Sequence, residues 1–224
     1  MKHIIITGTS RGIGLQLALH LAGLGHRILA LSRTTAGELL GNPNITCLSV
    51  DLADSGSIQD ITGVLDSWGR VDAIVHNAGA MALKPFEQTT PGDFEQIYRV
   101  NVFAVAELTR IALPHLAKGS HVVAISSMGG IQGSVKFAGL SAYSSSKGAV
   151  ITLMELLAEE FRDRGVSFNT LALGSVNTEM LAGAFPGYKA PIDASEMAGF
   201  IADFVLDKQR YFNGKVLQVS TTTP

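Results

Sequence analysis

Thr7-Gly8-Thr9-Ser10-Arg11-Gly12-Ile13-Gly14 is the stretch that decides the fold, because it joins a strand-forming run to a helix-forming one. Residues 3–7 before it are mostly β-branched. After it, apolar side chains recur at the spacing of one helix face (Ile13, Leu17, Leu21). Glycines at such a junction allow a tight turn and leave the free amides of the helix N-terminus pointing at an anion. The stretch therefore predicts a strand, a phosphate-binding turn and a helix.

The spacing of the glycines does not by itself identify the ligand of this turn. It is not the GxGxxG of the commonest dinucleotide fold, and no Gly-Lys-Ser/Thr follows as in an NTPase loop. Glycines also simply punctuate turns, so the position directly after the first strand carries the argument for a bound dinucleotide. The predicted contacts are Gly8, Thr9, Ser10, Arg11, Gly12, Ile13 and Gly14.

Outward from this turn, short apolar runs alternate with stretches of helical period along the whole chain. Their nearly continuous apolar content is typical of strands covered on both faces. The pattern predicts the α/β class, with a doubly wound, Rossmann-like parallel sheet, helices on both faces and one domain over residues 1–224. The expected strands are 3–7, 27–31, 46–50, 73–76, 121–126, 167–173 and 216–219.

Composition excludes several classes of function. The chain has 224 residues, of which 46% are hydrophobic and 16% charged, and its net charge is −2. This balance offers no basic surface for nucleic acid or an anionic membrane. The apolar runs are far shorter than the roughly 20 residues that span a bilayer. A single cysteine, Cys47, and a first strand that leaves no room for a signal sequence indicate a cytoplasmic protein.

The end of the second expected strand bears on which dinucleotide is bound. An NAD enzyme usually places an acid about 20 residues beyond the glycines to bind the ribose 2′-hydroxyl, whereas a 2′-phosphate requires a cation. Here the position reads Ser32-Arg33, and Arg11 adds a second positive charge. Either arginine alone could be an ordinary solvated side chain. Together, with the acid missing, they favour NADP(H) over NAD(H).

Tyr143 and Lys147 stand four residues apart in Tyr143-Ser144-Ser145-Ser146-Lys147. On a helix this spacing stacks two side chains on one face, about 6 Å apart. The ammonium would favour the phenolate, and we expect it to lower the tyrosine pKa towards neutrality. A tyrosine and a lysine on a solvated helix face would give the same pattern, so the pair gains its weight from the other motifs.

Taken together, these motifs resemble the short-chain dehydrogenase/reductase family, of the classical single-domain kind, from Lys2 to about Val219. The resemblance adds four further matches to the glycine turn and the Tyr-x-x-x-Lys signature. These are Asp51-Leu52 as an adenine contact, Asn77-Ala78-Gly79 after the fourth strand, the catalytic asparagine at Asn101 and the catalytic serine at Ser127.

The resemblance implies a role for each of these residues. Tyr143 would be the general acid and base, and Lys147 would stabilise its phenolate and hold the nicotinamide ribose. Ser127 would donate a hydrogen bond to the substrate oxygen, and Asn101 would position a water that links Lys147 to solvent. For Asn77 we favour a structural role, tying strands together.

Three departures from the family pattern stand out. The gap between Ser127 and Tyr143 is a few residues longer than usual, so the loop from Gly129 to Ser141 must bulge, and Ser126 remains a second candidate for the serine role. Leu173-Gly174 replaces the usual Pro-Gly, before the predicted nicotinamide-side contacts. Those contacts are Val176 and Thr178. The Gln218-Val219-Ser220 ending lacks the usual Asp-Gly-Gly.

Other kinds of site find little support in the sequence. The six histidines show no i, i+4 pairing and Cys47 stands alone, so we expect no metal site. His76 beside Asn77 is expected to be a core or strand-end residue. There is no GxSxG elbow of a serine hydrolase.

The segment from Glu179 to Asp193 precedes a helix expected to start near Ala194, and it could act as a small mobile lid. Its apolar residues favour a small neutral aldehyde, ketone or secondary alcohol over a polyanion. They are Met180, Leu181, Phe185 and Tyr188. The leading hypothesis is an NADP(H)-dependent oxidoreductase. The alternatives are a non-catalytic NADP(H)-binding sensor or scaffold and, less favoured, an epimerase or dehydratase.

The helices expected near Asn101 and Tyr143 carry more apolar positions than one sheet face can cover. Because the family commonly pairs subunits through these helices, we expect a homodimer or homotetramer. Complete packing on the sheet is the alternative. The positions are Val102, Val105, Leu108, Val150, Leu153 and Leu157.

Overall fold

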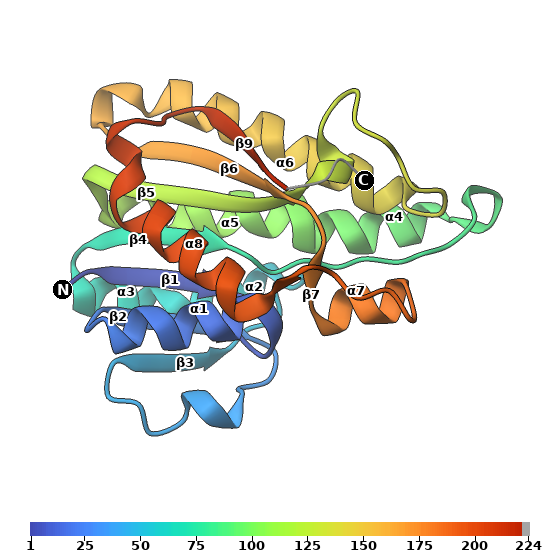
Figure 1. The fold of residues 1–224 in the computed structure, drawn as a ribbon. Helices are drawn as coiled ribbons and strands as arrows, with labels where there is room; N and C mark the ends of the chain where they lie inside the picture. Colours follow the sequence, from blue (N-terminus) through green and yellow to red (C-terminus); the bar gives the residue numbers. More distant parts are fainter. Residues whose placement is uncertain (221–224) are drawn as a thin grey trace.

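The computed structural model describes residues 1–220, and the tail 221–224, expected to be a frayed end, lies outside the described residues. Its centre is a seven-stranded sheet in the order β3-β2-β1-β4-β5-β6-β9, with every neighbouring pair parallel (Figure 1). The strands are β1 His3–Thr7, β2 Arg27–Ser32, β3 Ile45–Ser49, β4 Val71–His76, β5 Leu116–Ser127, β6 Ser167–Leu173 and β9 Lys215–Val219.

Helices cover both faces of the sheet (Figure 1). On one face lie α1 Gly12–Gly23 and α8 Ala194–Asp207, and on the other lie α2 Ser55–Ile58, α3 Thr62–Trp68, α5 Ala104–Ala112 and α6 Ser141–Glu160. The remaining helices are α4 Pro91–Tyr98, α7 Glu179–Ala184 and a π-helical turn, Arg99–Phe103. Short 3₁₀ turns occur at Gly37–Leu39, Gln59–Ile61, Phe86–Gln88, Leu113–His115, Met128–Gly130, Arg162–Arg164 and Lys208–Arg210.

The central strands divide the interior into two apolar cores. Ile4 and Ile6 of β1 face α1 and α8, whereas Ile5 between them faces the opposite core, and all three are fully buried. Burial on both faces explains why these strands read as continuous apolar runs rather than alternating ones. Among residues 1–220, no helix is long and apolar enough to cross a membrane.

The fold class and the parallel sheet expected from the sequence are confirmed. The expected helix near Ala194 begins at that residue as α8. The largest difference is in β5, which begins at Leu116 rather than at residue 121, because Leu116 pairs with Val71 before the register shifts. The bounds of β2, β3, β4 and β9 differ from the expected ones by one or two residues. A two-strand ladder between β7 Val176–Asn177 and β8 Ile192–Asp193 was not expected from the sequence, since two-residue strands carry no period.

Candidate active site

The predicted site residues gather where the strands end. β1, β4, β5 and β6 are parallel neighbours, so their carboxyl ends share one edge of the sheet. The strand order runs outward in opposite directions from β1 and β4, and ligands of open α/β sheets bind outside such a switch point. The loops at this end project together beyond the sheet (Figure 1).

The glycines of the turn between β1 and α1 are required by backbone angle or by close packing. Gly8 and Gly12 have φ angles of 74° and 58°, in the left-handed region. A Cβ on Gly14 would lie 2.2 Å from the Gly8 carbonyl oxygen and 2.5 Å from Asn77 Nδ2. The first turn of α1 therefore packs directly against the end of β1.

The N-terminus of α1 suits an anion. Arg11 occupies the N-cap in an extended conformation, its side chain makes no capping hydrogen bond among the described residues, and the first turn carries no acid. The amides of this turn and the helix dipole thus face outward. The Glu179 carboxylate lies close by, since its Oε2 would be 3.5 Å from a Cβ on Gly12, and its side chain is exposed. Thr9 is buried, while Ser10 and Ile13 are half-buried. A dinucleotide pyrophosphate fits these features of the chain.

Asn77 ties the end of β4 to the glycine turn. Its Nδ2 donates to the carbonyl oxygens of Thr7 at 3.0 Å and Gly8 at 3.3 Å. The hydroxyl oxygen of Thr7 in turn accepts from the backbone amides of Asn77 and Ala78, each at 3.0 Å. These contacts agree with the structural role expected for Asn77.

The second strand ends beside the glycine turn. Thr9 Oγ1 donates to Ser32 Oγ at 3.3 Å, and Ser32 Oγ donates to the Thr34 carbonyl at 2.8 Å. Arg33 follows with an exposed side chain, as does Arg11. Asp51 is exposed just beyond β3, and Leu52 packs partly buried against the core. Both arginines are thus accessible to a ligand.

Tyr143 and Lys147 lie on one face of α6, as the spacing predicts. The Lys147 ammonium nitrogen is 5.8 Å from the centre of the Tyr143 ring. Lys147 is buried and donates to the Ile125 carbonyl oxygen at 2.7 Å. This burial lowers the pKa of Lys147 to about 8, so the ammonium form is retained at neutral pH.

The pKa of Tyr143 corrects the sequence prediction. Burial raises it above its usual value, and a hydrogen bond with Ser127 opposes that shift only in part. We expected Lys147 to lower the pKa, but loss of hydration around the phenol is the larger effect. The phenol is therefore the stable form in the protein alone at neutral pH.

The two serines at the end of β5 have separate surroundings. Ser126 is buried, and its hydroxyl donates to the Lys147 carbonyl at 2.8 Å. Ser127 is half-buried, accepts from the Gly129 amide at 3.2 Å, and acts on the Tyr143 hydroxyl by lowering its pKa. The geometry thus places Ser127, rather than Ser126, beside the phenol.

Asn101 is buried in the π-helical turn between α4 and α5. Its Oδ1 accepts from the Ala80 amide at 2.7 Å, and its Nδ2 donates to the Ala80 carbonyl and to Ser146 Oγ, each at 2.9 Å. A Cβ on Gly79 would lie 3.6 Å from Asn101 Oδ1 and 3.5 Å from Lys147 Nζ. π-Helical turns often occur at functional sites.

Ser146 is a site residue that the sequence analysis did not single out. Its hydroxyl accepts from Asn101 and donates to the Tyr143 carbonyl at 2.6 Å, which links the π-helical turn to α6. The available signal was its place inside the Tyr-x-x-x-Lys stretch, one residue before Lys147.

The segment after β6 flanks the glycine turn. Val176 is buried in the core, and Thr178 caps α7 by accepting from the Leu181 amide at 3.3 Å. A Cβ on Gly12 would lie 3.6 Å from the Thr178 methyl group. The stretch predicted as a lid contains a helix, α7, and a short strand, β8, rather than loop alone.

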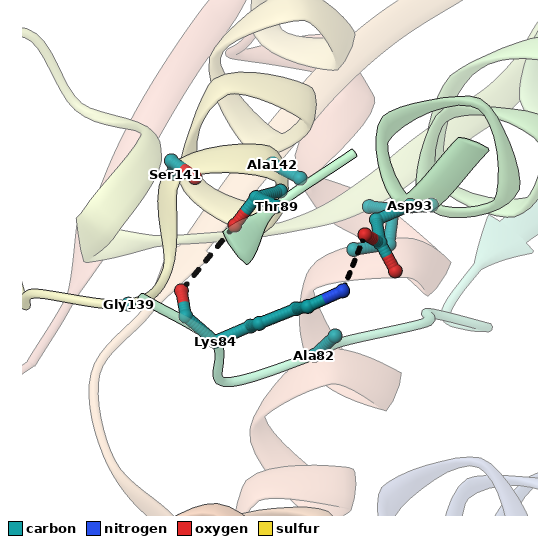
Figure 2. Close-up of a pocket in the computed structure, with 8 residues that line it drawn as sticks. Ala82, Lys84, Thr89, Asp93, Gly139, Ser141 and Ala142 are labelled. Carbon is teal, nitrogen blue, oxygen red and sulfur yellow. Dashed lines mark hydrogen bonds and ion pairs between the residues drawn. The ribbon is translucent and has the colours of Figure 1, made fainter. Parts of the chain in front are cut away.

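A small pocket lies between the loop after β4, α4 and the start of α6 (Figure 2). Lys84 Nζ binds Asp93 Oδ2 at 2.8 Å, and Thr89 Oγ1 donates weakly to the Lys84 carbonyl at 3.4 Å. The buried Ser141 hydroxyl has no partner among the described residues. The volume is about 10 Å³, enough for a single water molecule.

Two histidines are buried without forming a site. His76 Nε2 and Thr109 Oγ1 lie 2.9 Å apart, and burial lowers the pKa of His76 to about 3. His121 contacts Asn169 at 3.0 Å, and burial lowers its pKa to about 4. No group of three or more potential metal ligands occurs within residues 1–220.

Known proteins resemble the chain over nearly its whole length. The short chain dehydrogenase family model matches residues 2–189. A trihydroxynaphthalene reductase from Colletotrichum orbiculare is 26% identical, covering 97% of this chain and 88% of its own. A short chain dehydrogenase from Burkholderia cenocepacia in complex with NADP is 27% identical, with a TM-score of 0.88, covering 99% of this chain and 97% of its own.

The fold also matches a 3-ketoacyl-(acyl-carrier-protein) reductase from Brucella melitensis complexed with NADH. The TM-score is 0.85 at 23% identity, covering 97% of this chain and 96% of that one. Structures with either nicotinamide dinucleotide therefore share this architecture. On the family match and the geometry above, the chain belongs to the classical short-chain dehydrogenase/reductase family of oxidoreductases.

Proposed function

We propose that the protein is an NADP(H)-dependent oxidoreductase that interconverts a carbonyl compound and a secondary or primary alcohol, with Tyr143 as the general acid and base. One observation carries the proposal: Ser127 and Lys147 both lie at the Tyr143 side chain, because Ser127 opposes the rise in the tyrosine pKa and the buried Lys147 ammonium lies 5.8 Å from the ring centre. A protein that only bound a dinucleotide would not need this arrangement. We place the activity in one catalytic domain spanning 1–224, in the cytoplasm.

The nicotinamide, when bound, supplies or accepts the hydride. During reduction, negative charge grows on the carbonyl oxygen, and Tyr143 donates its proton there. Ser127 donates a hydrogen bond to the same oxygen. Removing a comparable preorganised donor from an acyl-transfer site slows catalysis by about 10²–10³. Lys147 stabilises the phenolate that remains and holds the nicotinamide ribose, and Asn101 positions a water that leads from Lys147 to solvent.

Two exposed cations support NADP(H) as the cofactor. Arg33 follows β2, where an NAD enzyme usually carries an acid, and Arg11 caps α1. The resemblance to an NADP complex adds weight, whereas the NADH complexes among the similar folds show that the fold accepts either cofactor. We propose further contacts with the dinucleotide at Ser32, Asp51, Leu52, Asn77, Ala78, Gly79, Val176 and Thr178.

The substrate is proposed to be a small neutral carbonyl compound or alcohol. The segment after Thr178 presents apolar side chains, including exposed Met180 and Tyr188. The similar trihydroxynaphthalene reductase is named for reducing a neutral aromatic compound. We also propose that the active form is a homodimer or homotetramer.

The test is consumption of NADPH with a panel of aldehydes and ketones. We expect turnover by the unaltered protein and none by Tyr143→Phe, which keeps the ring and removes only the hydroxyl, with NADPH binding retained. Ser127→Ala should lower kcat while leaving NADPH affinity unchanged, and Lys147→Ala should weaken both. The losses should not add, because the three groups act on one transition state.

Ser126→Ala is the matched serine control. It removes a hydroxyl whose partner is the Lys147 carbonyl rather than Tyr143. We expect it to alter kcat less than Ser127→Ala does. Normal kcat in Tyr143→Phe would defeat the proposal, as would tight NADPH binding without turnover of any carbonyl compound.

A further inference from the structure

Exposed apolar side chains gather on three segments at the carboxyl end of the sheet. Large apolar residues normally stay inside, so an exposed cluster near a binding site indicates an apolar ligand or partner. The segments are the loop after β4, the loop from Ile131 to Leu140, and the stretch from α7 to Tyr188. Their exposed members are Leu83, Phe86, Val135, Phe137, Met180 and Tyr188.

Phe137 and Phe185 bring two of these segments together. Their rings meet edge to face, with centroids 5.8 Å apart, a favoured geometry for aromatic pairs. Phe137 lies on the loop that runs from Ser127 to Tyr143, and Phe185 follows α7, which starts next to Thr178. The pair therefore joins the side of the site that carries the proposed acid to the side that flanks the glycine turn.

The third segment is attached to the same loop. The Lys84 amide donates to the Gly139 carbonyl at 2.9 Å. A Cβ on Gly139 would lie 2.8 Å from Leu83 Cδ1, so this leucine packs against the loop. Figure 2 shows Gly139 and Lys84 side by side at the start of α6. The three segments thus form a connected apolar border, which we call the collar.

Lys136 and Lys84, the cations on the first two segments of the collar, are engaged within the protein, whereas Lys189, which follows Tyr188, is exposed. Lys136 Nζ donates to the Ile131 carbonyl at 2.5 Å and to Ser134 Oγ at 2.6 Å. Lys84 is paired with Asp93. Neither ammonium is left without a partner to recognise a substrate carboxylate or phosphate.

We propose that Phe137 and Phe185 determine substrate specificity, an inference that rests on the proposed function. The two rings hold the flat, apolar body of a carbonyl substrate while its oxygen faces Tyr143 and Ser127. Edge-to-face rings expose aromatic surface on which a flat ring system can stack. A small aliphatic ketone has no flat ring system to stack on this pair. The enzyme should therefore favour large aromatic ketones over small aliphatic ones.

The experiment compares 2-acetylnaphthalene with butanone, using NADPH as the reductant. In Phe137→Ala and Phe185→Ala we expect KM for 2-acetylnaphthalene to rise about tenfold or more. For butanone, kcat/KM should stay within about twofold, and NADPH affinity should not change. The double variant should lose little beyond either single one, because the rings act as a pair. Phe137→Tyr should keep the low KM, since it keeps the ring.

Phe200→Ala is the matched control. Phe200 lies on α8 and is 42% exposed, against 43% for Phe137. We expect both substrates to behave as they do with the unaltered protein. Turnover of butanone as efficient as that of 2-acetylnaphthalene, or an unchanged KM in both alanine variants, would overturn the specificity role alone. Absence of turnover with every carbonyl compound, despite NADPH binding, would overturn the proposed function and this role with it.

Discussion

At the scale of single residues, burial sets the protonation of the central pair. Burial raises the pKa of Tyr143, and burial lowers the pKa of Lys147 to about 8. At neutral pH the protein therefore presents a neutral phenol beside an ammonium. A neutral phenol is the form that donates a proton, so this state suits the carbonyl reduction proposed above.

The first prediction concerns Arg33. If its guanidinium binds the 2′-phosphate, the unaltered protein should bind NADPH about tenfold more tightly than NADH, or about 1.4 kcal/mol. Arg33→Asp should reverse that order, because it removes the cation and supplies an acceptor for the ribose hydroxyl. Calorimetric titration measures both affinities.

Arg27→Asp is the control for this charge reversal. Arg27 is also exposed, but it lies at the opposite end of β2. Its substitution should leave both affinities unchanged. Equal affinity of the unaltered protein for the two dinucleotides would exclude the assignment.

Residues linked by local spacing were the predictable part of the site. The four-residue interval placed Tyr143 and Lys147 on one helix face, as observed. The pKa of Tyr143 was not predictable, because burial depends on segments far away in the sequence. The bond between Asn101 and Ser146 was equally hidden, since it joins residues 45 positions apart.

At the scale of elements, the turn Met128–Gly130 determines where the long loop bulges. A Cβ on Gly130 would lie 2.6 Å from the Lys147 carbonyl carbon, so this turn packs directly on the backbone of α6. The sequence predicted a bulge from Gly129 to Ser141. The structure restricts it to the residues between this turn and α6, and leaves Ser127 next to Tyr143.

The second prediction follows from this contact. Gly130→Ala should push the turn away from α6, lower kcat and destabilise the protein by roughly 1–3 kcal/mol, as overpacking does. Denaturant unfolding and steady-state kinetics provide the two measurements. Gly199→Ala in α8 is the control, since no described atom within 4 Å would meet its Cβ. It should preserve kcat and either keep or raise stability. Unchanged stability and kcat in Gly130→Ala would show that the contact does not matter.

Long elements were predictable and short ones were not. Runs such as β6 Ser167–Leu173 have the expected bounds because apolar content over several residues marks a buried strand. The β7–β8 ladder and α7 were missed, since elements of two to six residues depend on tertiary contacts. The hydrogen bond from the Lys84 amide to the Gly139 carbonyl was not predictable either, because it also depends on a tertiary contact.

At the scale of the whole molecule, two buried histidines make stability depend on pH. His76 and His121 have their pKa values lowered from 6.5 to about 3 and about 4. Below pH 6.5 these two histidines bind protons in the unfolded chain but stay neutral in the folded protein. The free energy of unfolding therefore decreases as the pH is lowered, until the folded histidines are protonated as well.

The third prediction puts a size on this loss. At about pH 5, each histidine should reduce the free energy of unfolding by about 2 kcal/mol relative to neutral pH. Denaturant unfolding at several pH values measures the slope. His76→Asn and His121→Asn should each flatten it, whatever their effect on stability at neutral pH. A slope that the double variant shares with the unaltered protein would show that other groups cause it.

The fourth prediction concerns assembly, and the structure changes which residues carry it. Val105, Leu108 and Val150 are fully buried within one chain, so they cannot form the interface. Leu156 remains exposed on α6, and Phe103 remains exposed at the end of the π-helical turn that leads into α5. We predict a symmetric dimer through that face, and Leu156→Asp should dissociate it because a charge enters an apolar contact.

Sedimentation at micromolar concentration checks this prediction. Leu24→Asp serves as the control: Leu24 is 54% exposed, against 63% for Leu156, and lies at the end of α1. It should leave the dimer intact. A monomeric unaltered protein would contradict the assembly.

The bonds from Asn77 to the glycine turn have a consequence for biosynthesis. They join residues 70 positions apart, and β1 lies between β2, made soon after it, and β4, made much later. A nascent chain of which only the residues up to β3 have emerged from the ribosome therefore contains the glycines and Arg33. It still lacks Asn77, whose hydrogen bonds fix the glycine turn. Such non-local pairing slows folding and leaves a strand edge open to aggregation. During translation, the cofactor can stabilise the growing chain only after the fourth strand has emerged.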